Sequence, residues 1–315
     1  MKNKTDSVQL VLPGLEWEER SGPVSAKDAV KDAFRDIEGI YEGRTDRPPR
    51  GLPFGFAELD RWIVGLKEAE LTVIGSLPGT GKTQFTLHAA RHVAEGFSEP
   101  VLFFSPESRG PKLLLRLLSL VGHIPANRII TGDIEENDWP KLTTAAGRLS
   151  DMPLFFDDSP DPTMPEIKRK AISIRERVGL GLIIVDGLES IRLSGMIRGS
   201  ETDHFERARL LKSIARSLDV PMIVTANLER RLMSSADRRP ASSDLMDRHI
   251  EIFADLILLL HKETVAVHAG KQYTNRSLID VNVAKNRSGP TGRVRLVLDR
   301  RYLRLAEEDQ TGILV

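Results

Sequence analysis

The chain has 315 residues, 40% of them hydrophobic, and its 45 Lys and Arg equal its 45 Asp and Glu. This length is at the upper end for one domain and supplies enough apolar side chains for one sizeable core. A formal net charge of zero excludes the class of proteins that coat nucleic acid through a large positive charge. Any contact with nucleic acid must therefore come from a local basic loop. The absence of cysteine excludes disulfide scaffolds, zinc fingers, iron–sulfur centres and thiol nucleophiles. With no signal peptide and no apolar run near about 18 residues, we expect a soluble, cytoplasmic protein with no membrane contact.

The N-terminal part is predicted to contain a tail and an amphipathic helix. Residues 1–24 are expected to form a flexible tail, in which the apolar patch at 8–12 could instead be a docking peptide. A helix, and the segment that separates it from the rest of the chain, are predicted over 25–50, because Ser25 and Asp28 have the spacing of a capping pair and two prolines follow the helix. Its apolar side chains share one stripe, made of Val30, Phe34, Ile37 and Tyr41. The stripe can pack on the chain's own globule or on a neighbouring copy, and its pattern favours neither.

From residue 51 to residue 315, apolar runs typical of strands alternate with amphipathic helical patterns. The runs predicted as strands are 71–74, 101–104, 154–156, 182–185 and 222–225. Runs without alternation are expected of strands covered on both faces, and their alternation with helices implies a parallel sheet. Three closely spaced runs near the C-terminus predict antiparallel strands, at 254–260, 278–284 and 294–298. We therefore predict one α/β domain over 51–315, with a mostly parallel twisted sheet flanked by helices.

The strongest local signal is a P-loop motif between a predicted strand and a predicted helix. Residues 75–83 read Gly-Ser-Leu-Pro-Gly-Thr-Gly-Lys-Thr, so the first glycine of the usual G-x-x-x-x-G-K-T falls on Ser76. Glycines let backbone N–H groups turn toward phosphate oxygens, the lysine reaches the β and γ phosphates, and the threonine hydroxyl coordinates Mg²⁺. We therefore predict ATP and Mg²⁺ as cofactors. The predicted ligands are Ser76, Pro78, Gly79, Thr80, Gly81, Lys82 and Thr83.

Two acidic side chains follow predicted strands and are candidates for the same site. Asp186 ends the run 182–185, where its carboxylate would face the phosphates and help Thr83 to hold Mg²⁺. Glu107 follows the run 101–104 and is the candidate to orient or deprotonate the attacking water. An ordinary strand-ending Asp and a solvated loop Glu are the alternatives.

His88 and His92 lie four residues apart on the predicted helix after the P-loop. Position 89 is alanine, so the HExxH zinc motif is absent, and neither a third ligand nor a base accompanies the pair. We predict partly exposed polar side chains at both positions.

Together these motifs resemble those of the bacterial replicative helicase family, which is DnaB-like and belongs to RecA-fold superfamily 4. The resemblance covers residues 25–305 and follows the family's order of motifs. Besides the P-loop, the matching segments are 51–60, 104–107, 186–189, 226–230, 236–240, 243–245 and 285–292. The family's N-terminal helical domain, which helps to assemble the ring and to bind primase, has no counterpart in this match.

The resemblance implies a RecA-like ATPase that forms a hexameric ring. Members of the family hydrolyse ATP between subunits and move along single-stranded DNA that passes through the pore. The segment 25–43 falls on their linker helix, which docks on the adjacent subunit, so the resemblance favours a neighbouring copy as the partner of the stripe. A loader or a primase is an expected further partner.

Catalytic roles are also implied by the resemblance. Glu107 falls on the family's catalytic glutamate, and Asn227 falls on its sensor glutamine, one methylene shorter, within the ATP site. Lys285 and Arg287 fall on a Lys-x-Arg pair that the neighbouring subunit inserts. Such a guanidinium stabilises the charge that develops on the γ-phosphate, and we expect both residues to act in catalysis with Lys82 and Glu107.

The segment expected to contact DNA departs from the family pattern. The family reads Arg-Glu-Ser-Gly where residues 246–249 read Met-Asp-Arg-His, one residue shorter and without the glycine that lets backbone N–H groups approach phosphate. A second departure is Glu189, an acid where the family has an amide. The DNA-binding candidates are Arg230, Arg231, Asp247 and Arg248, and the arginines could equally be surface charges.

Three functions are compatible with these residues. The first is an ATP-driven translocase or helicase on single-stranded DNA in DNA replication. The second is a non-translocating RecA-fold ATPase whose nucleotide state switches assembly or partner binding. The third is a recombinase-like protein that forms a filament on DNA. The two DNA-acting functions predict ATP hydrolysis that DNA stimulates in a salt-sensitive way, whereas the second predicts hydrolysis indifferent to DNA.

Overall fold

The computed structural model of the protein describes residues 23–42, 51–193, 200–229, 239–263 and 275–307. The patch at 8–12 and the candidates Arg230 and Arg231 lie outside the described residues. Within them, one nine-stranded sheet has the order β3-β2-β4-β5-β1-β6-β7-β8-β9. The strands from β3 to β6 in this order pair in parallel, and β7, β8 and β9 continue the sheet in antiparallel pairs. This mixed sheet confirms the predicted fold class.

The described strands differ little in position from the predicted ones. Their bounds are β1 Leu71–Ser76, β2 Val101–Phe104, β3 Leu154–Asp157, β4 Leu182–Val185, β5 Met222–Asn227, β6 Leu256–Lys262, β7 Arg276–Asn286, β8 Gly292–Asp299 and β9 Arg304–Glu307. The prediction that the run 254–260 forms an antiparallel strand holds for only one of its neighbours. Strand β6 is antiparallel to β7 but pairs in parallel with β1. The short β9 was not predicted.

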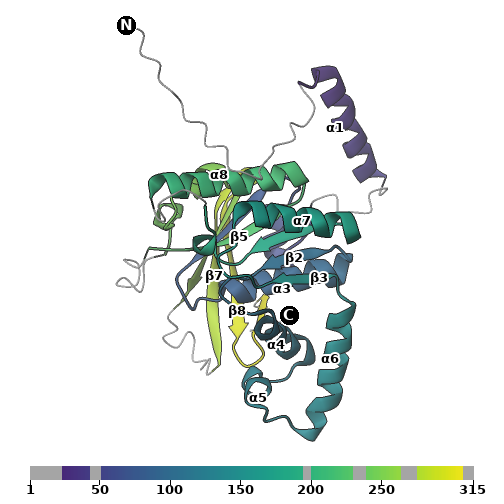
Figure 1. Ribbon diagram of the computed structural model, residues 1–315, viewed down its shortest axis with the longest axis vertical. Coiled ribbons are helices and arrows are strands. Elements are labelled where there is room, and N and C mark those ends of the chain that lie inside the picture. The colour runs from purple at the N-terminus through teal and green to yellow at the C-terminus, as the bar shows by residue number, and fades with distance from the viewer. Residues whose placement is uncertain (1–22, 43–50, 194–199, 230–238, 264–274, 308–315) are drawn as a thin grey trace.

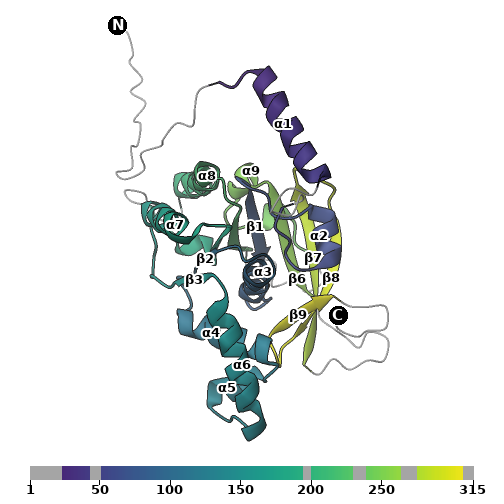
Figure 2. The ribbon, with the colours of Figure 1, turned by 90° about the vertical axis from the view of Figure 1, so that its right-hand side faces the viewer.

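Helices lie on both faces of the sheet. The described helices are α1 Ala26–Tyr41, α2 Ala57–Ile63, α3 Lys82–Phe97, α4 Gly110–Gly122, α5 Ala126–Thr131, α6 Trp139–Asp151, α7 Met164–Val178, α8 Glu201–Leu218 and α9 Ile250–Phe253. In Figure 1, α7 and α8 lie at the top of the sheet, and α4, α5 and α6 extend below it. Figure 2 shows α2 beside β7 and β8, on the side away from α7. None of the helices in the described ranges is long and apolar enough to cross a membrane.

The central strand β4 faces two separate cores, which explains its uninterrupted apolar sequence. In β4, Leu182 and Ile184 belong to the core that contains α3, whereas Ile183 and Val185 belong to the core under α7 and α8. Successive side chains of a strand point to opposite faces, so β4, which is covered on both sides, is apolar until it ends. Its first polar neighbour, Asp186, therefore lies at the carboxyl edge of the sheet.

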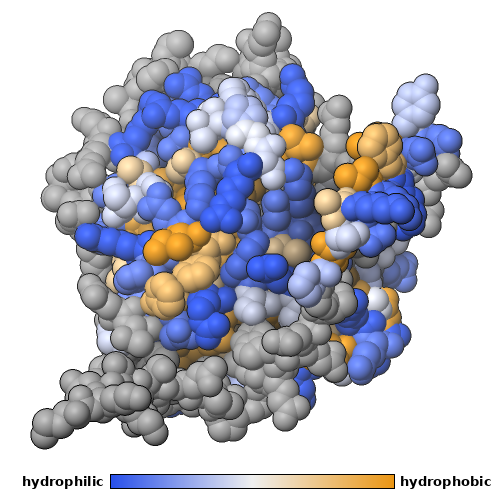
Figure 3. Space-filling model, turned by 90° about the horizontal axis from the view of Figure 1, so that it is seen from above, coloured by the Kyte–Doolittle hydropathy of each residue, from blue (hydrophilic) through white to orange (hydrophobic). Residues whose placement is uncertain are grey.

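The helix predicted in the N-terminal part is present as α1 and exposes its apolar stripe. The Ser25 hydroxyl accepts the backbone N–H of Asp28 at 3.1 Å, as the capping pattern predicted. The stripe residues are all exposed, at 55% for Val30, 60% for Phe34, 58% for Ile37 and 90% for Tyr41. Figure 3 shows hydrophobic patches among hydrophilic side chains on the right, where α1 lies in Figure 1. The stripe is therefore not buried against the described part of its own chain.

Asp255 fixes the amino end of the strand that carries the P-loop. Its carboxylate accepts the backbone N–H of Leu71 at 2.8 Å and the ammonium of Lys212 at 2.5 Å. The backbone N–H of Asp255 in turn donates to the carbonyl of Leu71 at 2.9 Å. Because Asp255 directly precedes β6 and is buried, these bonds set the register between β1 and β6.

Replacement of the Asp255 side chain should destabilise the fold. Asp255→Ala leaves a buried backbone N–H and a half-buried ammonium without this acceptor, so we expect the free energy of unfolding to fall by about 3 kcal/mol. Urea denaturation followed by circular dichroism measures this change. Asp151→Ala, at an exposed position that ends α6, is the matched control and should change it by less than about 0.5 kcal/mol. A loss below about 1 kcal/mol for Asp255→Ala would contradict the anchoring role.

Candidate phosphate-binding site

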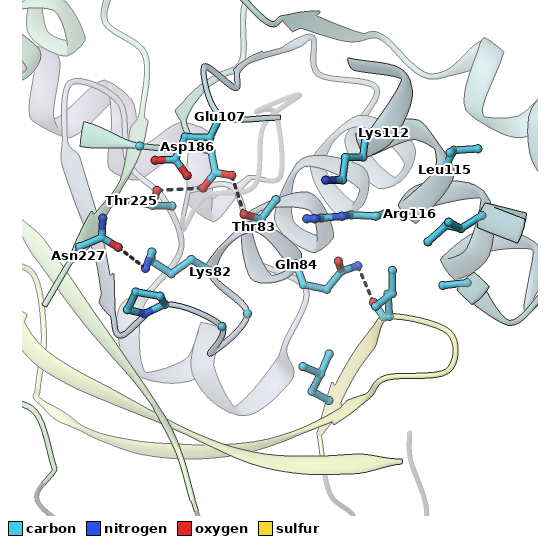
Figure 4. Close-up of a pocket in the computed structure, with 18 of the residues that line it drawn as sticks. Lys82, Thr83, Gln84, Glu107, Lys112, Leu115, Arg116, Asp186, Thr225 and Asn227 are labelled. Carbon is cyan, nitrogen blue, oxygen red and sulfur yellow. Dashed lines mark hydrogen bonds between the residues drawn. The ribbon is translucent and has the colours of Figure 1, made fainter. Parts of the chain in front are cut away.

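Four strand ends form one cavity at the carboxyl edge of the sheet. The P-loop follows β1, Glu107 follows β2, Asp186 follows β4, and Asn227 ends β5. Because these strands are parallel, their carboxyl ends meet at the same edge. The cavity has a volume of about 840 Å³ and is also lined by α4 and by the turn between β8 and β9 (Figure 4).

The P-loop backbone has the conformation that a phosphate cradle requires. Gly79 and Gly81 have φ angles of 77° and 114°, which are left-handed values that side chains other than glycine rarely adopt. A Cβ at Gly79 would meet nothing within 4 Å, so the loop opens toward the cavity. Helix α3 begins at Lys82, directly after the loop, and its N-terminal N–H groups add a positive partial charge. Thr80 is buried beneath the loop and does not line the cavity.

The Lys82 ammonium is bound by acceptors from β1 and β5. It donates to the Ser76 carbonyl at 3.0 Å, to the Ser76 hydroxyl at 3.3 Å and to Oδ1 of Asn227 at 2.9 Å. Burial lowers the pKa of Lys82, and three nearby carboxylates act in the opposite direction. Those carboxylates belong to Glu189, Asp186 and Glu107. The serine that replaces the first glycine of the motif is thus a lysine ligand.

Asp186 joins β4 to α3 and β5 through two hydroxyl groups. The Thr83 hydroxyl donates to Oδ2 of Asp186 at 2.7 Å, and the Thr225 hydroxyl donates to Oδ1 at 2.9 Å (Figure 4). Burial raises the pKa of Asp186, and the two hydroxyl donors oppose that shift. The hydrogen bond from Thr83 leaves the lone pairs of its oxygen directed away from Asp186, which suits coordination of a cation.

Several residues of the cavity were not predicted. Thr225, Glu189, Lys112 and Arg116 all line it, and Figure 4 shows Lys112 and Arg116 projecting from α4 toward it. Arg116 is close enough to lower the pKa of Asp186. Two of these residues had a signal in the sequence: Thr225 is the polar residue that ends the predicted apolar run 222–225, and Arg116 interrupts a run of leucines.

Lys285 and Arg287 lie at the opposite edge of the sheet. They are at the end of β7, where Lys285 pairs with Ile257 at the start of β6. The Lys285 ammonium donates to the Glu251 carbonyl at 2.6 Å, and Arg287 donates to Asp255 at 3.3 Å. The start of β6 lies beside the start of β1, whereas the P-loop follows the end of β1. These two cations are therefore not part of the phosphate site of their own chain.

The described DNA-binding candidates, Asp247 and Arg248, have different environments. Asp247 is buried, with Oδ2 at 3.1 Å from Nδ1 of His204, and burial raises its pKa. The exposed Arg248 guanidinium donates to Glu229 at 2.8 Å. Asp247 thus faces α8 in the interior, and Arg248 is the member of this pair that faces solvent.

The prediction for the two histidines was half wrong. His88 is buried and stacks on Phe56, with ring centroids 4.2 Å apart, whereas His92 is half-buried. Burial lowers the pKa of His88 to about 3, so this ring is neutral at ordinary pH. The aromatic segment before α2 supplies a packing surface that helical spacing alone did not reveal.

These residues fit a nucleotide and its cation. The left-handed glycines and the free N-terminus of α3 suit phosphate, the Lys82 ammonium suits the β and γ phosphates, and Thr83 with Asp186 suits Mg²⁺. The parallel sheet, the P-loop and the acid at the end of β4 together define a P-loop NTPase domain.

Comparison with known proteins gives the family. Residues 51–307 match the model of the DnaB-like helicase C terminal domain, and the chain belongs to this family. It is 35% identical over 278 residues to the replicative DNA helicase DnaC of Bacillus subtilis (strain 168), which covers 88% of this chain and 60% of the relative. It is 34% identical, with the same two coverages, to the replicative DNA helicase DnaB of Geobacillus stearothermophilus. The chain thus spans about 60% of the length of these curated relatives.

Solved structures show the same fold. One of them, an isolated ATPase domain, aligns with 91% of this chain and all of its own length, with a TM-score of 0.81 and 27% identity. A DnaB-like replicative helicase, solved in a study of its interactions with primase, aligns with 90% of this chain and 67% of its own length, with a TM-score of 0.76 and 27% identity. Nucleotide binding by the P-loop follows from this family membership.

Loss of the Lys82 ammonium should remove nucleotide binding. At a nucleotide concentration about 100 times the Kd, binding should stabilise the protein by about 2.7 kcal/mol and raise its Tm by roughly 5 °C. We expect Lys82→Ala to abolish this rise, because the phosphates lose their cation. Lys141→Ala, on the exposed surface of α6, is the matched control and should keep the full rise. Differential scanning fluorimetry with and without ADP measures both, and an undiminished rise in Lys82→Ala would place the nucleotide elsewhere.

Proposed function

We propose that this chain is the motor domain of an ATP-dependent helicase or translocase that acts on single-stranded DNA during replication. The observation that carries the proposal is the arrangement at the carboxyl edge, where Lys82, Thr83, Asp186 and Glu107 line one cavity. The likeness to replicative DNA helicases supports the same function.

The chemistry follows from the position of each group. The P-loop N–H groups and Lys82 would bind the phosphates, and Thr83 with Asp186 would hold Mg²⁺, whose charge would neutralise part of that of the phosphates. Glu107 extends from the end of β2 into the cavity and orients or deprotonates the attacking water (Figure 4). Asn227 joins the end of β5 to Lys82 and so responds to the phosphates that this ammonium contacts.

We further propose that the ATP site is completed by a neighbouring copy in a hexameric ring. Lys285 and Arg287 lie at the edge of the sheet opposite the P-loop, so they can serve a phosphate site only in another subunit. A heterologous, head-to-tail interface brings opposite edges of successive copies together, and it closes into a ring when the rotation between copies closes. The exposed stripe of α1 supplies apolar surface for the same interface.

The DNA-binding surface is proposed around the turn 246–249. The exposed Arg248 lies on this turn, and Arg230 and Arg231 follow β5, beyond the described residues. A phosphate of single-stranded DNA would compete with Glu229 for the Arg248 guanidinium. A loader or a primase is a further proposed partner, since one structural relative was solved in a study of its interactions with primase.

A second function, a nucleotide-switched ATPase that does not move along DNA, is favoured by one feature of the same turn. Asp247 is buried and Arg248 already has an acidic partner, so the turn offers DNA less free charge than its sequence suggests.

Hydrolysis of ATP should depend on Glu107 and should respond to single-stranded DNA. We expect Glu107→Gln to retain ATP binding and to slow hydrolysis at least about 100-fold, because the amide cannot accept the proton of water. In the wild type, single-stranded DNA should stimulate hydrolysis, and the stimulation should weaken as salt rises. Steady-state phosphate release at two salt concentrations measures both effects.

The control for this experiment is Glu136→Gln, an exposed acid that does not line the cavity, which should behave as the wild type. Hydrolysis that is undiminished in Glu107→Gln would remove this residue from the mechanism. Hydrolysis that is indifferent to DNA would instead favour the nucleotide-switched ATPase.

The role of Arg287 between subunits can be tested by mixing. Arg287→Ala and Lys82→Ala should each be inactive alone, because one lacks the inserted cation and the other lacks a working P-loop. Random assembly of equal amounts leaves about one quarter of the interfaces with both groups intact, so the mixture should regain up to about a quarter of the wild-type rate. Arg300→Ala, another exposed arginine, should stay active alone. A mixture without any recovery would contradict a site shared between copies.

A further inference from the structure

Glu189 is a carboxylate in the phosphate site that the proposed mechanism does not use. It lies in the short 3-10 turn η2, Leu188–Ser190, directly after β4 and Asp186. Its side chain lines the cavity, and burial raises its pKa. The charged groups that face it are Lys82 of α3 and Glu107 after β2.

The contacts of Glu189 lead to the ammonium group of the P-loop in two steps. Oε1 of Glu189 accepts the backbone N–H of Asn227 at 2.5 Å. The side chain of Asn227 then accepts the Lys82 ammonium, through Oδ1, at 2.9 Å. The bond to Glu189 holds the backbone of Asn227, and the side chain on that backbone makes the bond to Lys82.

We propose that Glu189 is a positioning residue of the phosphate site: its carboxylate holds the end of β5 and thereby places the Asn227 carboxamide against Lys82. The inference rests on the proposed function for the identity of the ligand, whereas the contacts of Glu189 do not depend on that identity.

The position of Asn227 makes such an anchor necessary. Asparagine has a single methylene between its backbone and its carboxamide, so a small shift of the β5 backbone breaks its contact with Lys82. Asn227 pairs with Ser76 of β1 on one side. On its other side, β5 pairs with β4 only as far as Val224, so no strand is there to accept the backbone N–H of Asn227. Glu189 supplies an acceptor on the side where β4 has ended.

The same anchor reaches the turn proposed to contact DNA. The carbonyl of Asn227 accepts the backbone N–H of Met246 at 3.0 Å, and Leu228 forms an antiparallel bridge with Leu245. A displaced Asn227 backbone would therefore loosen residues 245–246 as well as the contact with Lys82.

Amide hydrogen exchange of the nucleotide-free full chain tests the anchor directly. Mass spectrometry of peptides that cover residues 222–229 reports the Asn227 amide. In Glu189→Ala this amide loses its acceptor, and we expect its exchange to accelerate at least about tenfold. Glutamine keeps an oxygen acceptor at the same position, so Glu189→Gln should exchange within about twofold of the wild type. Glu176→Gln, an exposed acid of α7, is the control for a lost surface charge.

Two results would overturn the proposal. Unchanged exchange in Glu189→Ala would show that the carboxylate does not hold β5. Equal acceleration in Glu189→Ala and Glu189→Gln would show that the acceptor is not what matters.

Steady-state kinetics supply the second readout. We expect kcat for ATP to fall at least about fivefold in Glu189→Ala and to stay within about twofold in Glu189→Gln, because only the former displaces Asn227. Equal kcat in Glu189→Ala and in the wild type would also count against the proposal. A wild-type chain without ATP hydrolysis would refute the proposed function, whereas the exchange experiment, done without nucleotide, would still decide the role of Glu189.

Discussion

The ammonium group of Lys82 is the constraint around which the site is built. A cation partly removed from water must be matched by acceptors, or its burial would cost several kcal/mol. The ends of β1 and β5 supply the acceptors, which are the carbonyl and hydroxyl of Ser76 and the carboxamide of Asn227. The carboxylates of Glu189, Asp186 and Glu107, which follow β4 and β2, add favourable negative charge nearby. The geometry that neutralises one buried charge therefore also assembles the residues that a nucleotide needs.

The sheet and the phosphate site could be predicted to a large extent because their signals are local. An apolar run that ends in a polar residue marks both a strand and its functional edge, as at Asp186, and a glycine-rich loop marks the cradle. The carboxylate of Asp60 shows what such signals omit. It accepts the backbone N–H groups of Phe54, Gly55 and Phe56, a folded turn that no periodicity indicated.

Other features could not be predicted because they depend on contacts between distant segments. Arg116 of α4 lines the same cavity as the P-loop, and the buried ring of His88 stacks on that of Phe56. Asp247 is likewise buried, and its carboxylate lies against His204 of α8. In each case the residue type suggested exposure, whereas the environment includes residues more than 25 positions away in the sequence.

Strand β1 joins two features that were described separately. Its first residue, Leu71, is bonded to Asp255, which also binds Arg287, and its last residue, Ser76, is bonded to Lys82. Six residues of strand measure about 17 Å and are stiff along their length. In a ring where Arg287 reaches the phosphate site of the next copy, each β1 would be a rigid connection between the nucleotide of its own subunit and that of the next one. The distance between neighbouring sites would then be set inside each subunit, and a shift at one phosphate would be carried to the next mechanically.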